Sequence, residues 1–244
     1  MVSNSIPNEG IEVVADQTFA LLLAVARQIP HHHEAMRAGR PDRGTGTSVW
    51  GKTLGIVGLG NIGKAVVRRA RGFDMHILAS TPHPDREFCR KFGVEVVSLE
   101  HLLAASDFVS LHLRLNPQTR GIIGPAELAA MKPGAILVNT ARPELVVETA
   151  LTDALLAGRL GGAGLDDKPT DWNGPLLHLP NVVCTPHLGN RAIEGMRAVF
   201  ETALFDAVRV LQGQRPVHLL NPEVYDSPHL RTTEGIIRAG GAGI

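Results

Sequence analysis

Short, continuously apolar runs alternate with helical stretches along most of this chain. The runs lie at 54–57, 75–80, 108–113, 135–141, 161–166 and 181–186, and helical stretches such as 99–105 and 144–157 precede several of them. Strands that are apolar on both faces are typical of a parallel sheet covered by helices on both sides. The pattern therefore predicts an α/β fold with a doubly wound, Rossmann-like parallel sheet.

Two further helices are predicted outside this alternation. Residues 11–29 carry apolar positions too densely for a solvent-washed helix and run into Pro30, so we expect a helix buried on most sides. Residues 191–212 are amphipathic and end at Gly213, and the Gly- and Pro-rich stretch 38–48 predicts a linker or surface loop. We therefore expect a dinucleotide-binding domain over 1–188 with an N-terminal dimerisation helix, a C-terminal helix with a remnant of a smaller substrate domain over 189–225, and a loosely ordered tail over 226–244.

Composition narrows the class of partner. The 244 residues include 24 basic ones (Lys plus Arg) and 24 acidic ones (Asp plus Glu). This balance of charge indicates a small-molecule ligand rather than nucleic acid or an anionic membrane. Cys89 and Cys184 lack CxxC spacing, so we expect neither a zinc site nor a disulfide framework, and a reducing cytoplasm. No early apolar run reaches the roughly 20 residues of a bilayer span. The run 30–35, PHHHEA, has nothing at metal-ligand spacing to complete it, so we expect an exposed cluster and no metal.

A glycine-rich turn follows the run at 54–57 and precedes a helix expected to begin near Lys64. Its sequence, Gly58-Leu-Gly60-Asn61-Ile62-Gly63, has the GxGxxG spacing. The first glycine permits a tight turn, the second lets backbone N–H groups approach a pyrophosphate, and the third lets the helix pack on the strand. Because a helix amino terminus favours an anion, this turn predicts a dinucleotide site.

The loop after the second strand bears on which dinucleotide is bound. An NAD-binding chain usually carries an acid about twenty residues after the glycine turn, where this chain has Ser80 and Thr81. These hydroxyls can donate to a 2′-phosphate, and His83 and Arg86 could add positive charge. Asp85 argues the other way if the loop folds back. We expect NAD or NADP, with a slight leaning to NADP.

Three loops at predicted strand ends carry polar side chains suited to a substrate with a carboxylate. Arg142 has a planar fork that can pair with a carboxylate, and His187 can exchange a proton near neutral pH. An acid hydrogen-bonded to His187 would orient it. A loop arginine is also often a solvated charge, and a histidine after proline can simply end a strand, so spacing alone does not establish a reaction.

The segments GKTLGIVGLGNIGKAVVRRARGF, SDFVSLHLRLNPQTRGII, MKPGAILVNTAR, LTDALLAGRLGGAGLD and LPNVVCTPHLGN together resemble the D-isomer-specific 2-hydroxyacid dehydrogenases, over roughly residues 2–222. The resemblance implies hydride transfer between NAD(P)H and a small 2-keto or 2-hydroxy acid. It implies that Arg142 binds substrate, that His187 is the acid/base, and that Asp166 contacts the nicotinamide carboxamide. Thr140, Ala141 and Gly189 fall in the same motifs and are assigned to the cofactor.

The chain departs from the family pattern at several positions. The glutamate that usually pairs with the histidine is replaced by Asp171; Asp167 could reach the histidine instead, or no acid pairs with it. Pro143 replaces a glycine, and Arg114 replaces a proline and is expected to face solvent.

The chain also opens near the crossover into the nucleotide domain, so about half of the substrate cleft is expected to be absent. Alternatives to a homodimeric enzyme are therefore a cofactor-binding, dimerising remnant without turnover, or a start internal to a longer protein.

Overall fold

The computed structural model describes residues 8–167, 169 and 171–226, and these fall into two compact units. The larger unit spans Glu12–Asn190, and the smaller one includes Arg191 onward together with the residues before Glu12. We describe each unit by itself.

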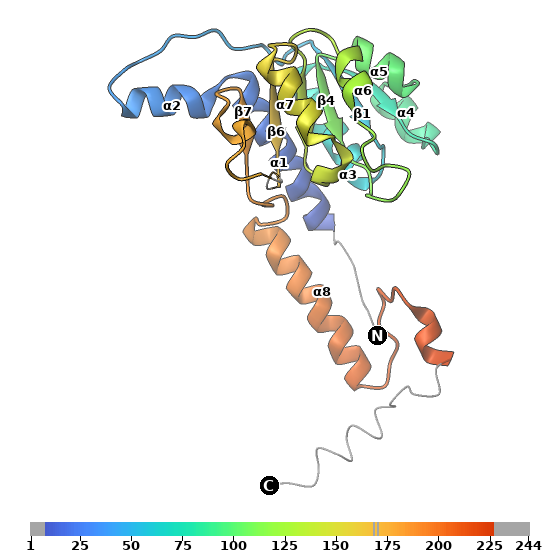
Figure 1. Ribbon diagram of the computed structural model, residues 1–244. Coiled ribbons are helices and arrows are strands. Elements are labelled where there is room, and N and C mark those ends of the chain that lie inside the picture. The colour runs from blue at the N-terminus through green and yellow to red at the C-terminus, as the bar shows by residue number, and fades with distance from the viewer. Residues whose placement is uncertain (1–7, 168, 170, 227–244) are drawn as a thin grey trace. The chain divides into compact units, whose positions relative to one another are not determined.

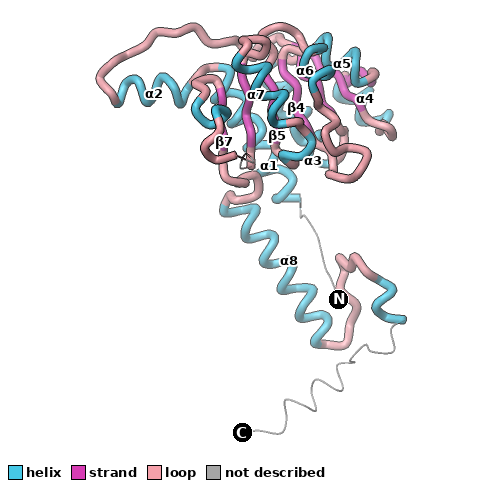
Figure 2. Tube along the Cα trace, in the orientation of Figure 1, coloured by secondary structure: helices cyan, strands magenta, loops and turns pink. Residues whose placement is uncertain are grey.

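Seven parallel strands form the centre of the larger unit (Figures 1 and 2). Their order across the sheet is β3-β2-β1-β4-β5-β6-β7, so the chain reverses its direction of travel between β1 and β4. In such sheets ligands bind at the carboxyl ends of the strands near the reversal. The strands are β1 Thr53–Val57, β2 His76–Ser80, β3 Val94–Val96, β4 Phe108–Leu111, β5 Ile136–Asn139, β6 Gly162–Leu165 and β7 Val182–Cys184.

Helices cover both faces of this sheet, as expected for continuously apolar strands. On β6, the hydrogens of Gly162 and Gly164 face α1, where an added Cβ would meet Val25 Cγ1 at 2.5 Å and Leu21 Cβ at 3.0 Å. Ala163, which points to the opposite face, belongs to the buried cluster that includes Leu151. The helices are α1 Asn8–Ala26, α2 Ile29–Arg37, α3 Asn61–Ala70, α4 Arg86–Phe92, α5 Leu99–Ala105, α6 Pro125–Ala130, α7 Glu148–Leu156 and α8 Ile193–Leu211, with short 3₁₀ turns at Arg71–Phe73, Pro143–Leu145, Pro175–His178 and Pro222–Asp226.

The doubly wound prediction is confirmed, and the differences lie at helix ends. The helix expected near Lys64 begins at Asn61, and the one expected over 144–157 begins at Glu148 because Pro143–Leu145 forms a separate 3₁₀ turn. Pro30 does not simply close the first helix. That helix ends at Ala26, and Pro30 lies in the first turn of α2, where its missing N–H costs nothing.

The first helix is buried on most sides, as predicted. Leu21, Leu22 and Val25 are at most 4% exposed, and Phe19 stacks on Phe73 with ring centroids 5.4 Å apart. These apolar side chains are thus already covered within the chain. The homodimer and the dimer contact predicted for this helix stay predictions.

The smaller unit contains α8, which confirms the predicted amphipathic helix, and Gly213 follows it at a φ of 74°. Asp206 is 2% exposed, accepts a hydrogen bond from the N–H of Val217 at 2.8 Å, and shares one of 3.2 Å with His218 Nδ1. The chain after α8 therefore folds back onto that helix. Beyond residue 226, the predicted tail lies outside the described residues.

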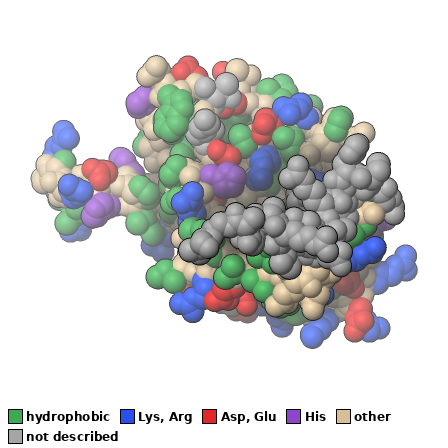
Figure 3. All heavy atoms as spheres, turned by 90° about the horizontal axis from the view of Figure 1, so that it is seen from below, with side chains coloured by type: hydrophobic (Ala, Val, Ile, Leu, Met, Phe, Trp, Pro, Cys, Tyr) green, Lys and Arg blue, Asp and Glu red, His purple; other side chains and the backbone are tan. Residues whose placement is uncertain are grey.

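Surface charge agrees with the balanced composition. On the face that Figure 3 shows, basic, acidic and histidine side chains are interspersed with hydrophobic ones. Within the described part of the chain, no helix is both long and apolar enough to cross a membrane.

Candidate active site at the carboxyl edge of the sheet

The glycine turn has the geometry that its spacing predicts. Gly58 has a φ of +97°, and an added Cβ there would lie 2.7 Å from the carbonyl oxygen of His112. At Gly63 an added Cβ would collide with the carbonyl oxygen of Gly58, so α3 packs directly on the turn. An added Cβ at Gly60 would meet no atom of the described residues within 4 Å beyond its chain neighbours, which leaves open space at the amino terminus of α3.

The charge at this helix end suits a pyrophosphate. Gly60 is the N-cap of α3 and no side chain caps the helix, so the partial positive charge of the helix end is presented to the open side of the turn. Asn61 and Ile62 form the first turn of α3. The residues present thus suit a dinucleotide with its phosphates held by backbone N–H groups.

The end of β2 lies next to this turn. The carbonyl oxygen of Ser80 accepts a hydrogen bond from Gly58 N at 2.9 Å, and Ser80 and Thr81 are half-buried. The acid of this loop is engaged: Asp85 pairs with Lys64 Nζ at 2.7 Å and caps α4 by accepting from Phe88 N at 3.0 Å. The hydrogen bond from Lys64 holds the pKa of Asp85 below its usual range.

His112 is a residue of this edge that the sequence analysis did not single out. It follows β4 directly, its N–H donates to Val57 O at 2.8 Å, and its ring shares a 2.9 Å hydrogen bond with Ser110. Desolvation of the ring lowers the pKa of His112 to about 4, so the ring is neutral at physiological pH. Its position after the strand next to β1 was the available sequence signal.

The loop that carries Arg142 is held by the buried side chain of Asn139. Asn139 Oδ1 accepts a hydrogen bond from Ala141 N at 3.0 Å, and Asn139 Nδ2 donates to Arg142 O at 2.7 Å. Thr140 shares a 2.9 Å hydrogen bond with Thr18 of α1. These contacts fix the backbone while the guanidinium of Arg142, which donates to Ala141 O at 2.6 Å, stays exposed.

Asp166, 3% exposed, anchors the loop that carries His187. One carboxylate oxygen accepts from Thr185 Oγ1 at 2.6 Å and Leu188 N at 2.8 Å, and the other accepts from Gly189 N at 2.6 Å. A Cβ on Gly189 would lie 2.8 Å from that second oxygen. The loop thus depends on Asp166, a role distinct from the cofactor contact that the resemblance implies.

His187 is oriented by an acid, but this acid is not Asp171, the one favoured from the sequence. Its Nδ1 lies 3.1 Å from Asp167 Oδ2, whereas the carboxylate of Asp171 accepts from Asn173 N at 2.9 Å. The pairing of Asp171 with His187 is therefore corrected to Asp167, which directly follows Asp166 and so shares its position beside the loop of His187. The Asp171 main chain instead contacts Glu148, with a distance of 3.4 Å from N to Oε1.

A cavity brings the strand-end residues together. It is mostly apolar, and Arg142, Asp166 and Asp167 all line it, with Asp167 bonded in turn to His187. Glu148, also in the lining, was not anticipated, and no sequence signal marked it. Pro143, which replaces the glycine of the family pattern, lines the cavity and starts a 3₁₀ turn. Arg114, which replaces a proline, is exposed, as expected.

Fold and site together define a dinucleotide-binding α/β protein with a cationic and an imidazole group at the sheet edge. Residues 19–189 match the NAD-binding domain model of the D-isomer specific 2-hydroxyacid dehydrogenases. The chain belongs to this family of oxidoreductases, and the predicted resemblance is confirmed.

Individual relatives agree with this assignment. The chain is 42% identical over 222 residues to a glyoxylate reductase of Korarchaeum cryptofilum, covering 87% of this chain and 67% of the relative. It is 40% identical over 213 residues to a D-3-phosphoglycerate dehydrogenase of Methanocaldococcus jannaschii, covering 85% of this chain and 41% of the relative. An acyclic imino acid reductase solved with NADPH and D-Arg superposes with a TM-score of 0.80 at 32% identity, covering 90% of this chain and 71% of that one. The chain thus spans between about two fifths and about seven tenths of the length of these three proteins.

Proposed function

We propose that this protein transfers hydride between NAD(P)H and a small 2-keto or 2-hydroxy acid with specificity for the D isomer. The observation that carries the proposal is the strand-end cavity, where Arg142 and the His187–Asp167 pair belong to the same sheet edge as the glycine turn. The names of the relatives, glyoxylate reductase and D-3-phosphoglycerate dehydrogenase, support a substrate of this class.

Arg142 is assigned to the substrate carboxylate. Its backbone is fixed by Asn139 while its guanidinium is exposed at the cavity, so the charged group can approach an anion without moving the loop. A guanidinium binds a carboxylate with two parallel hydrogen bonds, which also fixes the direction of the neighbouring carbonyl. Bound NAD(P)H supplies the hydride for that carbonyl carbon.

His187 is assigned to the proton on the carbonyl oxygen. Because Nδ1 contacts the Asp167 carboxylate, Nε2 is the nitrogen left to hold the proton that reaches the substrate oxygen. The contact with Asp167 fixes the orientation of the ring. Reduction takes this proton from Nε2, and oxidation of the hydroxy acid returns it.

The experiment is to measure NADH and NADPH binding by fluorescence titration, beside oxidation of each cofactor with glyoxylate and with hydroxypyruvate. Binding together with turnover supports the proposal. Binding without turnover would instead identify the alternative, a cofactor-binding remnant of such an enzyme. Absence of binding would contradict both.

For the cofactor, we propose a preference for NADPH. Asp85, the acid in the loop after β2, is neutralised by Lys64, and half-buried Ser80 and Thr81 stand where a carboxylate usually repels a 2′-phosphate. The structural neighbour solved with NADPH is consistent with this.

Substitution Asp85→Asn tests the preference. Asparagine still caps a helix, but it releases Lys64 for a 2′-phosphate. The ratio of kcat/KM for NADPH over NADH should therefore rise about tenfold, which is the effect of one charge-assisted hydrogen bond. The matched variant Lys64→Gln should lower the ratio. A wild-type enzyme that strongly prefers NADH would contradict the assignment.

A further inference from the structure

Helix α2 (Ile29–Arg37) has no buried residue, so few packing contacts hold it in place. The chain then reverses at Gly39, whose φ is +66° and whose N–H donates to Met36 O at 3.0 Å, and Arg40 N donates to Ala35 O at 3.0 Å. This reversal returns Asp42 to the side of α2 that carries the histidines.

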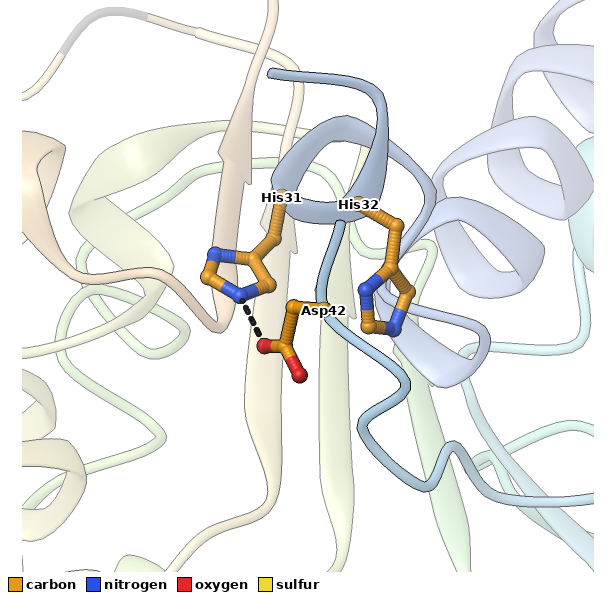
Figure 4. A group of neighbouring side chains, drawn as sticks. All are labelled: His31, His32 and Asp42. Carbon is orange, nitrogen blue, oxygen red and sulfur yellow. Dashed lines mark hydrogen bonds and ion pairs between the residues drawn. The ribbon is translucent and has the colours of Figure 1, made fainter. Parts of the chain in front are cut away.

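Three potential metal ligands meet there (Figure 4). One ligand atom from each of His31, His32 and Asp42 lies within 4.8 Å of the other two. His31 Nε2 and Asp42 Oδ2 are 3.0 Å apart, and the two imidazole rings lie with centroids at 5.3 Å. The side chains converge although they come from a helix and from the loop after it.

The cluster also contains an unsatisfied atom. His32 Nδ1 is buried and has no hydrogen-bond partner among the described residues. A buried nitrogen without a partner is unfavourable, and native structures usually supply one. The loop covers this ring, because an added Cβ at Gly44 would lie 3.1 Å from His32 Cε1.

We propose that His31, His32 and Asp42 bind a divalent cation of the Zn²⁺ type. Two imidazole nitrogens and one carboxylate oxygen suit Zn²⁺ and similar transition metals, whereas Mg²⁺ and Ca²⁺ take oxygen ligands. Ligands on a tetrahedral Zn²⁺ are about 3.3 Å apart, close to the separation of the His31 and Asp42 atoms. Water completes the fourth position.

The role of this ion is structural. It ties the loop over 38–46, which has no regular structure, to a helix that packing alone holds weakly. No metal was expected from the sequence, because His31 and His32 have no third ligand at a recognised spacing. The third ligand is supplied only by the reversal at Gly39.

The test uses the full chain freed of metal and titrated with ZnCl₂ against a chromophoric chelator. We expect one high-affinity Zn²⁺ per chain. Each of His31→Gln, His32→Gln and Asp42→Asn should weaken binding at least about tenfold. The matched control is His33→Gln, an exposed histidine of the same helix outside the cluster, which should bind like the wild type.

A second readout follows the loop. Zn²⁺ should slow trypsin cleavage after Arg43 in the wild type and in His33→Gln, and have no such effect in Asp42→Asn. A wild-type chain that does not bind Zn²⁺, or an equal loss of binding in His33→Gln, would overturn the proposal.

Discussion

The acid that contacts His187 could not be identified from the sequence. From the sequence, His187 could pair with Asp171, with Asp167 or with no acid. A motif with a shortened loop does not fix the path of that loop. The structure places Asp167 3.1 Å from the ring, since Asp166, its neighbour, is bound by three donors of the histidine loop. The candidate residues could thus be predicted, but their pairing could not.

Asp167→Asn should therefore lower kcat with hydroxypyruvate by about tenfold to a hundredfold, because the amide no longer supplies the charged acceptor that orients the ring. Asp171→Asn, a matched change four residues away, should stay near the wild-type rate. Steady-state kinetics of both variants decide the pairing. A larger loss in Asp171→Asn would return the role to that residue.

His112 makes a prediction about stability against pH. The unfolded chain takes up a proton as pH falls through about 6.5, whereas the folded pKa is about 4, so the unfolded state binds more protons between these values. The free energy of unfolding should then fall by about 1.5 kcal/mol between pH 6.5 and pH 5 from this residue. Urea unfolding across that range measures it.

The control is His112→Gln, which removes this titration while keeping a group that can bond Ser110. Its unfolding free energy should fall less steeply over the same pH range than that of the wild type. Equal slopes in the two proteins would show that the ring is not held neutral.

Among the secondary-structure elements, strands were easier to predict than helix ends. A buried parallel strand is marked by its own apolar run, as Phe108–Leu111 and Ile136–Asn139 show. A helix end depends on local geometry: Pro143 starts a 3₁₀ turn that delays α7 to Glu148, and Pro30 lies in the first turn of α2. A proline can follow the end of one helix or lie in the first turn of the next. Tertiary contacts decide which of these occurs.

The turn between β1 and α3 allows two glycines to be compared. Gly60→Ala places a methyl group in open space where the cofactor phosphates are expected, so it should weaken NAD(P)H binding at least about tenfold and change the unfolding free energy by less than about 1 kcal/mol. Gly63→Ala collides with the Gly58 carbonyl and should cost about 1–3 kcal/mol of stability.

Cofactor titration and urea unfolding of both variants check this contrast. If Gly60→Ala binds NAD(P)H like the wild type, the open space at the helix terminus is not the phosphate site.

Over the whole molecule, the fold class and the strand-end site follow from the sequence because both depend on the order of apolar runs and on where they end. The site of His31, His32 and Asp42 does not, since a reversal at one glycine assembles it. The covering of the first helix does not follow from the sequence either: an apolar helix looks the same whether its own sheet or a partner covers it, and here Leu21 and Val25 pack on β6.

The central claim is that Arg142 and His187 serve one substrate at the edge of this sheet. The most direct measurement is the rate of NAD(P)H oxidation with hydroxypyruvate by the wild type, Arg142→Gln and His187→Gln, each with its cofactor affinity. The account predicts wild-type turnover, a loss of about 10²–10⁴-fold in His187→Gln, a strongly raised KM in Arg142→Gln, and unchanged cofactor binding in both. Variants as active as the wild type, or a wild type that binds cofactor without turnover, would contradict it.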